Sequence, residues 1–469
     1  MLNILLATFF LLFFQNTLQQ QDECIQPSNY SDFTLLRIND AIYLTGGSST
    51  TLAVWSLGLT NGLNTTQTQC WTSWTNNNST NGFTPFTHGV GFKISDTSFA
   101  VQAGDHGSTI MSQLAYFDLE TDAWSAASGL VGTQPSARAR MTASLNQTSK
   151  KVYFYGGRTG LNQEKTYFNE FYHFDIGSST WYWPDVYYSG GQRPARYSHT
   201  SSLISDRLFI MGGKIAVNSA DSGWIVNPAD FQSVLVYDTV QQQSVSMATL
   251  GDIPDARYSY SAVEAPDGKS IIVFGGQNVS SQGTFDAFNN IYVLDTCTLN
   301  WSQPQINGNP PSPRAGHEAI VYNNRYMIVL MGIVGYTNEP VYTNDIAILD
   351  LVDWTWVSNL DPTAISQPSM ASCRFVFPVI REGNGDDNDN NQPLDTTVIS
   401  NNGSSSFTTK LALGITFGVL GFLLISTAIG IFLYKIRKDV DPHNNPRWLP
   451  KMLKKPLSST TSSIEQQEA

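Results

Sequence analysis

The stretch VYFYGGRTG, residues 152–160, places four bulky strand-forming residues directly before two glycines. Similar phrases recur as AIYLTGGSS at 41–49, LFIMGGKIA at 208–216 and IIVFGGQNV at 271–279. Two degenerate copies, SFAVQAG ending at Gly104 and YMIVLMG ending at Gly332, fill the gaps between them. The six copies are about 53–63 residues apart, a period that indicates an array of identical supersecondary units.

Each unit has further fixed positions around its glycines. About 15–20 residues before the glycines, four units carry an arginine, which we align as Arg140, Arg196, Arg257 and Arg314. After the glycines, an apolar run ends in Asp, and Trp follows six positions later in four units: Asp118 and Trp124, Asp175 and Trp181, Asp295 and Trp301, and Asp350 and Trp356. A fifth unit keeps Asp238 but has Ser244 in place of the Trp.

This order predicts four strands per unit, with the glycines after the second strand and the Asp at the turn before the fourth. Runs such as IIVF at 271–274 do not alternate with polar residues, so these strands should be buried on both faces. Antiparallel sheets of this kind can cover one another by stacking radially, which predicts an all-β propeller.

Each motif residue has a physical role in such a blade. The glycines allow a positive φ and close backbone approach, the Asp closes a tight turn, and the Trp packs between neighbouring blades. The predicted structural motif comprises Gly46, Gly47, Gly156, Gly157, Gly212, Gly213, Gly275, Gly276, Trp124, Trp181, Trp301 and Trp356.

At these residues the chain resembles the kelch-repeat family, from about residue 32 to residue 358. The resemblance implies a β-propeller of six or seven four-stranded blades. Six complete units are present, and SCRFVFPVI at 372–380 would add a seventh first strand. That segment closes the ring or caps the last blade, so the number of blades is predicted as six or seven.

The ends of the chain predict membrane attachment. The apolar run at 4–14 is typical of a signal peptide. Residues 411–434 carry no charge and are followed by Lys435, Arg437 and Lys438, which the positive-inside rule places in the cytoplasm. We therefore expect a single-pass protein of the plasma membrane or secretory pathway, with the propeller extracellular or luminal. Its predicted segments are a signal peptide at 1–20, the propeller at 24–380, a flexible stalk at 381–409, a transmembrane helix at 410–434 and a cytoplasmic tail at 435–469.

Three smaller signals accompany this topology. Gly414 and Gly418 form a G-x-x-x-G that could let two transmembrane helices form a homodimer. Four cysteines, Cys24, Cys70, Cys297 and Cys373, allow three disulfide pairings, among which the sequence does not choose. Eight sequons predict glycosylation before the membrane segment, at Asn29, Asn64, Asn77, Asn78, Asn146, Asn278, Asn300 and Asn402.

Composition and motifs argue against some classes of function. The net charge of −12 argues against nucleic-acid binding. A branch of kelch propellers that resembles galactose and glyoxal oxidases uses copper held by His and Tyr, and this oxidase remains the alternative prediction. Here His199 and His317 follow the repeat arginines by three residues, which suggests a structural role in the first strand. We therefore predict no catalytic, metal-binding or cofactor-binding residues.

A binding module is the main prediction. Loops between the second and third strands should emerge on one face of the propeller, and loops on a rigid scaffold commonly carry recognition. The expected partner is a protein or a cell-wall or matrix glycan. The candidate binding residues are the loop aromatics Trp224, Tyr167, Phe168, Phe285, Phe288, Tyr336 and Tyr342.

Overall fold

The computed structural model describes residues 24–367, apart from residues 28–29, 49, 75–82, 103, 107–108, 111–113, 160–164, 190–191, 220–222 and 280–284. Within these ranges all regular secondary structure is β-strand. The predicted signal peptide, stalk, membrane helix and tail lie outside the described residues, as does the segment 372–380. The described part contains no helix that could span a membrane.

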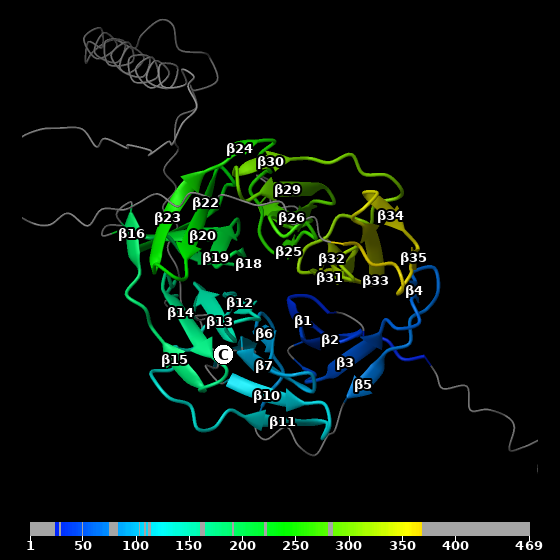
Figure 1. Cartoon of the computed structure of the whole chain (residues 1–469), viewed down its shortest axis with the longest axis horizontal. Helices are drawn as coiled ribbons and strands as arrows, with labels where there is room; N and C mark the ends of the chain where they lie inside the picture. Colours follow the sequence, from blue (N-terminus) through cyan, green and yellow to red (C-terminus); the bar gives the residue numbers. More distant parts are fainter. Residues whose placement is uncertain are drawn as a thin grey trace, which may run out of the picture. The chain divides into compact units, whose positions relative to one another are not determined.

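Six antiparallel four-stranded blades follow one another along the chain (Figure 1). The first three are β1 (Phe33–Ile38), β2 (Ala41–Gly46), β3 (Val54–Gly58) and β5 (Thr72–Trp74); β6 (Val90–Lys93), β7 (Ser98–Gln102), β10 (Leu114–Asp118) and β11 (Ala123–Ala126); and β12 (Thr142–Asn146), β13 (Lys151–Tyr155), β14 (Phe171–Asp175) and β15 (Thr180–Tyr182).

The last three blades repeat this order. They are β18 (Thr200–Ile204), β19 (Arg207–Met211), β22 (Ser233–Asp238) and β23 (Gln243–Ala248); β25 (Ser261–Glu264), β26 (Ser270–Phe274), β29 (Ile291–Asp295) and β30 (Asn300–Ser302); and β31 (Glu318–Tyr322), β32 (Tyr326–Tyr336), β33 (Pro340–Asp350) and β34 (Thr355–Val357).

The innermost strands close a ring of six blades. Each first strand contacts the first strand of the next blade, and β31 of blade six contacts β1 of blade one. At the outer side of the same seam, β35 (Asn359–Leu360) pairs with β4 (Leu63–Asn64). Within the described residues the ring is therefore complete without a seventh blade, which decides between the two predicted blade numbers.

Short strands cover the outer edges of several blades. The chain leaving one blade runs parallel to the fourth strand of the next, as β16 (Tyr187–Ser189) does along β23 and β24 (Leu250–Gly251) along β30. Single parallel bridges at Val131 and Asn307 do the same for β15 and β34. A covered edge cannot pair with another protein chain, which removes a source of aggregation.

Hairpins extend from the end of the propeller at which the second strand of each blade finishes, directly after the glycine pairs. In blade four, β17 (Ala195–Tyr197), β20 (Lys214–Ser219) and β21 (Gly223–Pro228) form a three-stranded sheet. Blade five carries the hairpin β27 (Gln277–Val279) and β28 (Phe285–Ala287), and in blade six β32 and β33 are themselves long. A further short pair, β8 (Asp105–His106) and β9 (Thr109–Ile110), follows β7 in blade two.

The repeated residues build the blades. The motif tryptophans Trp124, Trp181, Trp301 and Trp356 are all buried. All eight glycines of the four Gly-Gly pairs have positive φ, and a Cβ at Gly213 would lie 2.6 Å from the Tyr197 carbonyl oxygen. Asp118 Oδ1 accepts the backbone N–H groups of Glu120 and Thr121, and Asp238 and Asp295 close the corresponding turns in the same way.

The repeat arginines are buried and hold the glycine turns. Arg196 Nη1 donates to Gly212 O at 2.6 Å, and Arg257 Nη1 donates to Gly275 O at 3.1 Å. In blade three this role belongs to Arg138, whose Nη1 lies 3.4 Å from Gly156 O and 3.0 Å from Glu170 Oε2. Our alignment of Arg140 with the repeat arginines is therefore wrong. The sequence Ala-Arg-Ala-Arg offers two arginines two positions apart, and the residue types alone do not distinguish them.

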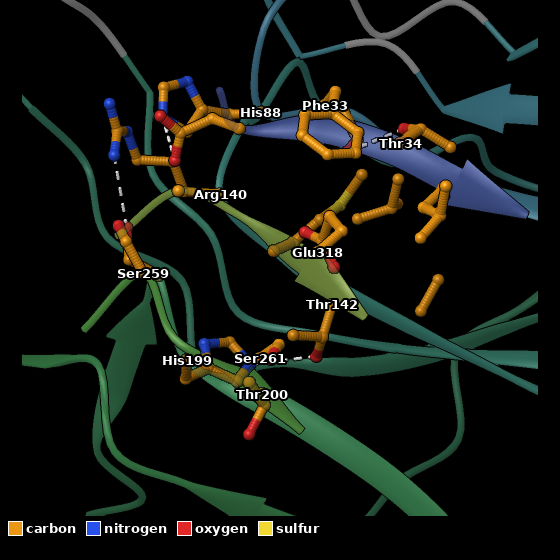
Figure 2. A pocket seen from close by; sticks show the side chains of 18 of the residues that line it. Phe33, Thr34, His88, Arg140, Thr142, His199, Thr200, Ser259, Ser261 and Glu318 are labelled. Atoms are coloured by element: carbon orange, nitrogen blue, oxygen red, sulfur yellow. Dashed lines mark hydrogen bonds and ion pairs between the residues drawn. The ribbon is translucent and has the colours of Figure 1, made fainter. Parts of the chain in front are cut away.

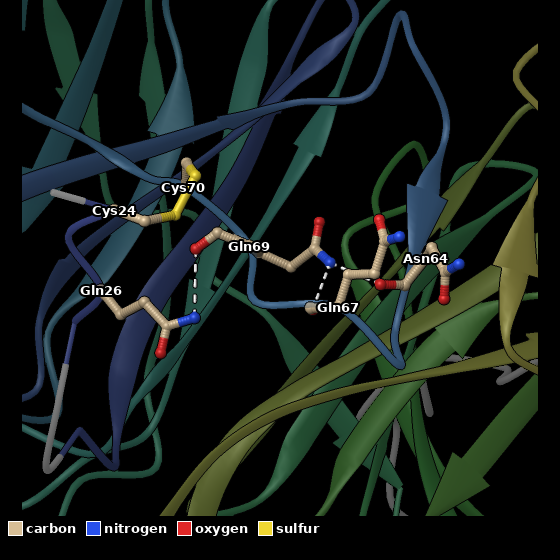
Figure 3. Close-up of a disulfide and its surroundings, with 6 residues drawn as sticks. All are labelled: Cys24, Gln26, Asn64, Gln67, Gln69 and Cys70. Atoms are coloured by element: carbon tan, nitrogen blue, oxygen red, sulfur yellow. Dashed lines mark hydrogen bonds between the residues drawn. A yellow bond between two sulfur atoms is a disulfide. The ribbon is translucent and has the colours of Figure 1, made fainter. Parts of the chain in front are cut away.

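A disulfide joins Cys24 to Cys70 and ties the N-terminal segment to blade one (Figure 3). Beside it, Gln26 Nε2 donates to Gln69 O at 3.1 Å, and the backbone N–H of Trp71 donates to Ile25 O. Cys297 is disulfide-bonded as well.

The two arginines of blade three provide a test of this register. Arg138→Ala should lower the free energy of unfolding by about 2–4 kcal/mol, because it removes charge-assisted hydrogen bonds to buried groups. Arg140→Ala should cost much less, because its guanidinium donates to Ser198 Oγ at 3.3 Å, lies 3.7 Å from the Asp105 carboxylate and is partly in solvent, without a bond to a glycine turn. Chemical denaturation of the full-length variants measures both. Equal losses would restore Arg140 as the repeat residue.

Candidate functional site

A ring of backbone hydrogen bonds forms one mouth of the central channel. Its members precede the six innermost strands and all have left-handed φ values between 50° and 64°: Asp32, His88, Arg140, Ser198, Ser259 and Gly316. Each backbone N–H donates to the carbonyl of the ring residue in the preceding blade, at 2.8–3.4 Å, and Asp32 closes the circle on Gly316. These residues rim a cavity of about 260 Å³ (Figure 2).

A charged cluster occupies one side of this rim. His88 lies between two carboxylates, with Nε2 3.1 Å from Asp32 Oδ1 and Nδ1 3.4 Å from Asp105 Oδ2. Two arginines approach the same Asp105 oxygen, Arg158 at 3.5 Å and Arg140 at 3.7 Å. Burial would raise the pKa of both aspartates, but His88 and the arginines outweigh it and lower the pKa of each. Both carboxylates are therefore ionised at neutral pH.

Further positively charged side chains lie beside this cluster. Burial and the charges of Arg140 and Arg158 lower the pKa of Lys214, whose Nζ lies 3.9 Å from the ring centroid of Tyr258. Burial and Arg140 likewise lower the pKa of Arg158. Positively charged side chains that lie close together lower one another's pKa in this way. This side of the mouth therefore favours an anion.

The predicted loop aromatics fall into two groups, of which the first is structural. Phe168 and Phe288 each cover a repeat arginine: Arg138 Cζ lies 3.6 Å from the ring centroid of Phe168, and Arg257 Cζ lies 4.1 Å from that of Phe288. Phe168 is buried, as is Tyr167. Two of the candidate binding residues, Tyr167 and Phe168, are thus enclosed by cation–π stacking and by the packing of the blade-four hairpin.

The second group is partly exposed. Trp224 of β21 is half-buried and packs on Tyr167 with 5.1 Å between ring centroids. Tyr336 is 50% exposed and meets Phe285 edge-on at 5.2 Å, while Tyr342 on β33 is half-buried. These contacts bring Phe285 and Tyr336 together from blades five and six, and place Trp224 on the hairpin of blade four.

The rim was not predicted from the sequence. Its six positions are occupied by Asp, His, Arg, Ser, Ser and Gly, so no shared residue type marks them. The spacing could have found them, because each lies two residues after the repeat arginine where one is present: Arg138, Arg196, Arg257 and Arg314. His88 occupies this rim position, one place before the register of His199 and His317.

Those two histidines lie between blades and pair with hydroxyl groups. His199 Nε2 lies 2.9 Å from Thr142 Oγ1, and His317 Nε2 lies 3.0 Å from Ser261 Oγ. Burial lowers the pKa of both rings, that of His317 to about 3, so both are neutral. In the part of the chain that the structure describes, no group of three or more His, Cys, Asp or Glu side chains could hold a metal ion.

Four predicted glycosylation positions lie on described strands, Asn64, Asn146, Asn278 and Asn300. Asn146 at the end of β12 caps its own turn, accepting the N–H groups of Thr148 and Ser149. The other four, Asn29, Asn77, Asn78 and Asn402, lie outside the described residues.

Comparison with known proteins supports the repeat architecture. The model of the KLHDC2/KLHL20/DRC7 Kelch-repeats domain matches residues 101–232 and 222–379. The chain belongs to the kelch-repeat family. Similar relatives include the human Rab9 effector protein with kelch motifs, 27% identical over 42% of this chain and 49% of that protein, and human Kelch domain-containing protein 1, 26% identical over 49% and 57%.

The chain is also similar to a plant protein and to one solved structure. Arabidopsis thaliana Acyl-CoA-binding domain-containing protein 5 is 27% identical over 48% of this chain and 32% of its own length. The matched region thus spans between about a third and just over half of these relatives. The solved structure of YjhT covers 72% of this chain and 98% of its own, with a TM-score of 0.50 and 14% identity, a likeness of fold alone.

Inside the kelch channel, Glu318 supplies a pH-dependent term in stability. Burial and the nearby negative charge of Asp32 raise its pKa to about 8 from the usual 4.5. The folded state therefore holds this proton more tightly than the unfolded state, and the associated stability is lost as pH rises from about 4.5 to about 8.

Glu318→Gln should remove this dependence. In metal-free buffer we expect wild type and variant to melt at similar temperatures near pH 4.5, and the variant to melt higher at pH 8.5. Thermal melts of the full-length protein across this range provide the measurement. Parallel curves for the two proteins at every pH would show that the carboxyl has an ordinary pKa.

Proposed function

We propose that this kelch propeller binds a protein partner through the rim of its central channel and recognises an acidic segment of that partner. The observation that carries the proposal is the group of cations Arg140, Arg158 and Lys214, which exceeds the carboxylates beside it. Unbalanced charge in a partly enclosed site favours a ligand of opposite sign.

The surroundings of these cations suit a polypeptide ligand. The aromatic rings of Tyr258, Phe285 and Tyr336 lie on the same end of the propeller, and aromatic side chains commonly anchor protein interfaces. The relative named Rab9 effector protein with kelch motifs carries a protein partner in its name. A glycan ligand would use the aromatics but would gain little from the cations unless it were acidic.

Charge reversal at the rim tests the proposal. Arg140→Glu combined with Lys214→Glu should weaken binding of fluorescently labelled Glu- and Asp-rich peptides by about tenfold or more, measured by anisotropy. Lys93→Glu combined with Lys151→Glu is the matched control, because it makes the same charge change at the far ends of β6 and β12–β13.

To test specificity, the same binding measurement is made with basic peptides that carry the same aromatic residues. Equal binding of acidic and basic peptides, or equal losses in both double variants, would contradict an anion-selective rim. Binding of neutral glycan fragments that persists in the rim variant would favour the glycan alternative instead.

We also propose that the propeller lies outside the cytoplasm, anchored by residues 411–434 as a type I membrane protein of the plasma membrane or secretory pathway. The uncharged span followed by Lys435, Arg437 and Lys438 supports this topology, and so do the sequons. The disulfide Cys24–Cys70 fits an oxidising compartment. Gly414 and Gly418 would then be available for a helix–helix contact between two copies.

Truncation before Thr409 should therefore release a glycosylated propeller into the medium of expressing cells. The expected readout is a secreted band that shifts on treatment with N-glycosidase. Retention of the truncated protein in the membrane fraction after signal cleavage, or secretion without glycans, would argue against this topology.

A further inference from the structure

The chain has four cysteines, and three of them lie among the described residues. Cys24 is bonded to Cys70, and Cys297 is also disulfide-bonded. Within one chain, Cys373 is the only cysteine left to be the partner of Cys297. Cys373 follows Gln367, the last of the described residues, by six positions. The surroundings of Cys297 and of the end of the described chain show whether such a short segment can join them.

Cys297 lies in the turn between the third and fourth strands of blade five, β29 and β30. Its backbone N–H donates to Asp295 Oδ1 at 2.9 Å, and the residue is half-buried. The neighbouring Thr296 donates its N–H to Lys269 O at 3.0 Å. Lys269 belongs to the turn between β25 and β26. Both turns of blade five therefore lie together, at the end of the propeller away from the glycine pairs.

The described chain returns to this end after it has paired across the closing seam. Asn323, in the turn between β31 and β32 of blade six, accepts the N–H of Ser366 at 3.3 Å. Asn324 borders the same cavity as Gly268, which lies in the turn between β25 and β26. Blades five and six are neighbours through β25 and β31 (Figure 1). The end of the described chain and Cys297 are thus held on turns of adjacent blades.

We propose that Cys373 forms a disulfide with Cys297 and fastens the chain that follows blade six back onto blade five. Cys373 lies seven positions after Ser366, and seven extended residues reach about 23 Å. Packed sheets lie about 10 Å apart and neighbouring strands about 5 Å apart. The segment is therefore long enough to pass from the inner turn of blade six to the outer turn of blade five.

The bond forms by thiol–disulfide exchange with the disulfide of an oxidising dithiol protein. The Cys297 thiolate attacks this disulfide and forms a mixed disulfide, and the Cys373 thiolate then attacks the Cys297 sulfur. The S–S bond between the two cysteines closes, their thiols lose two protons and two electrons in total, and the oxidant leaves as a dithiol. The Cys24–Cys70 bond requires an oxidant of the same kind.

The proposed bond and the bond between Cys24 and Cys70 lie on opposite sides of the closing seam. The first encloses all four strands of blade six in a covalent loop, and the second ties the N-terminal segment to blade one. Between them the rim closes through a hydrogen bond from the Asp32 N–H to Gly316 O at 2.8 Å. A covalent loop around the last blade restricts the unfolded chain, and so it stabilises the closed ring.

Peptide mapping of the full-length protein tests the pairing directly. Free thiols are blocked with N-ethylmaleimide, N-glycans are removed, and the protein is digested with trypsin without reduction. The four cysteines then lie in four separate peptides, and we expect residues 270–314 linked to residues 326–374 in a chain that is monomeric on a non-reducing gel. Blocked cysteines in both peptides, a disulfide-linked dimer, or linkage of either peptide to another cysteine peptide would overturn the proposal.

Variants of the full-length protein test what the bond does. Cys297→Ser and Cys373→Ser should each lower the midpoint of thermal unfolding by about 5 °C or more. The double variant should lose no more than either single variant, because all three lack the same bond. Ser372→Ala is the matched control, since it changes the adjacent residue and retains both cysteines, and it should melt like wild type.

Losses that add in the double variant, or an equal loss in Ser372→Ala, would contradict a shared bond. The mapping uses wild-type protein, so it decides the pairing even where a variant fails to fold. Neither measurement depends on peptide binding at the rim.

Discussion

The circle of backbone hydrogen bonds through Asp32, His88, Arg140, Ser198, Ser259 and Gly316 is the constraint on which both the fold and the candidate site depend. Five of its six members are not glycine, yet all have left-handed φ. Such residues are individually strained and persist only where the surroundings over-determine them. Here ring closure does so, because the backbone N–H of each residue donates a hydrogen bond to one neighbouring blade and its backbone C=O accepts a hydrogen bond from the other.

This circle also sets the chemistry of the mouth. It brings one residue from every blade to the same level, so side chains from positions far apart in sequence become neighbours. Asp32, His88 and Arg140 come from the first three blades, and the charged cluster lies on their side of the rim. The loops after the second strands then add Arg158 and Lys214 around it. A partner at this mouth would meet several blades at once.

The blades could be predicted from the sequence because their motif residues act locally. Gly156 and Gly157 are required by their own φ values, and Asp118 closes its own turn, so each leaves a signal within one repeat. The rim leaves none, because its residues are chosen by a contact between blades. For the same reason Arg138 and Arg140 were exchanged, and the Cys24–Cys70 pairing and the closure at β31 and β1 stayed open until the structure was known.

The buried arginines of this propeller are of two kinds. Arg196, Arg257 and Arg138 donate to backbone carbonyls of their own glycine turns, so their positive charge is used within one blade. Arg158 is almost as buried, but its partner Asp105 is shared with His88 and Arg140 at 3.4–3.7 Å. One carboxylate cannot fully satisfy two arginines and a histidine at such distances. Burial alone therefore does not mark a structural arginine in this fold. The carbonyl partner at the glycine turn does, whereas Arg140 and Arg158 share the Asp105 carboxylate at the mouth of the channel.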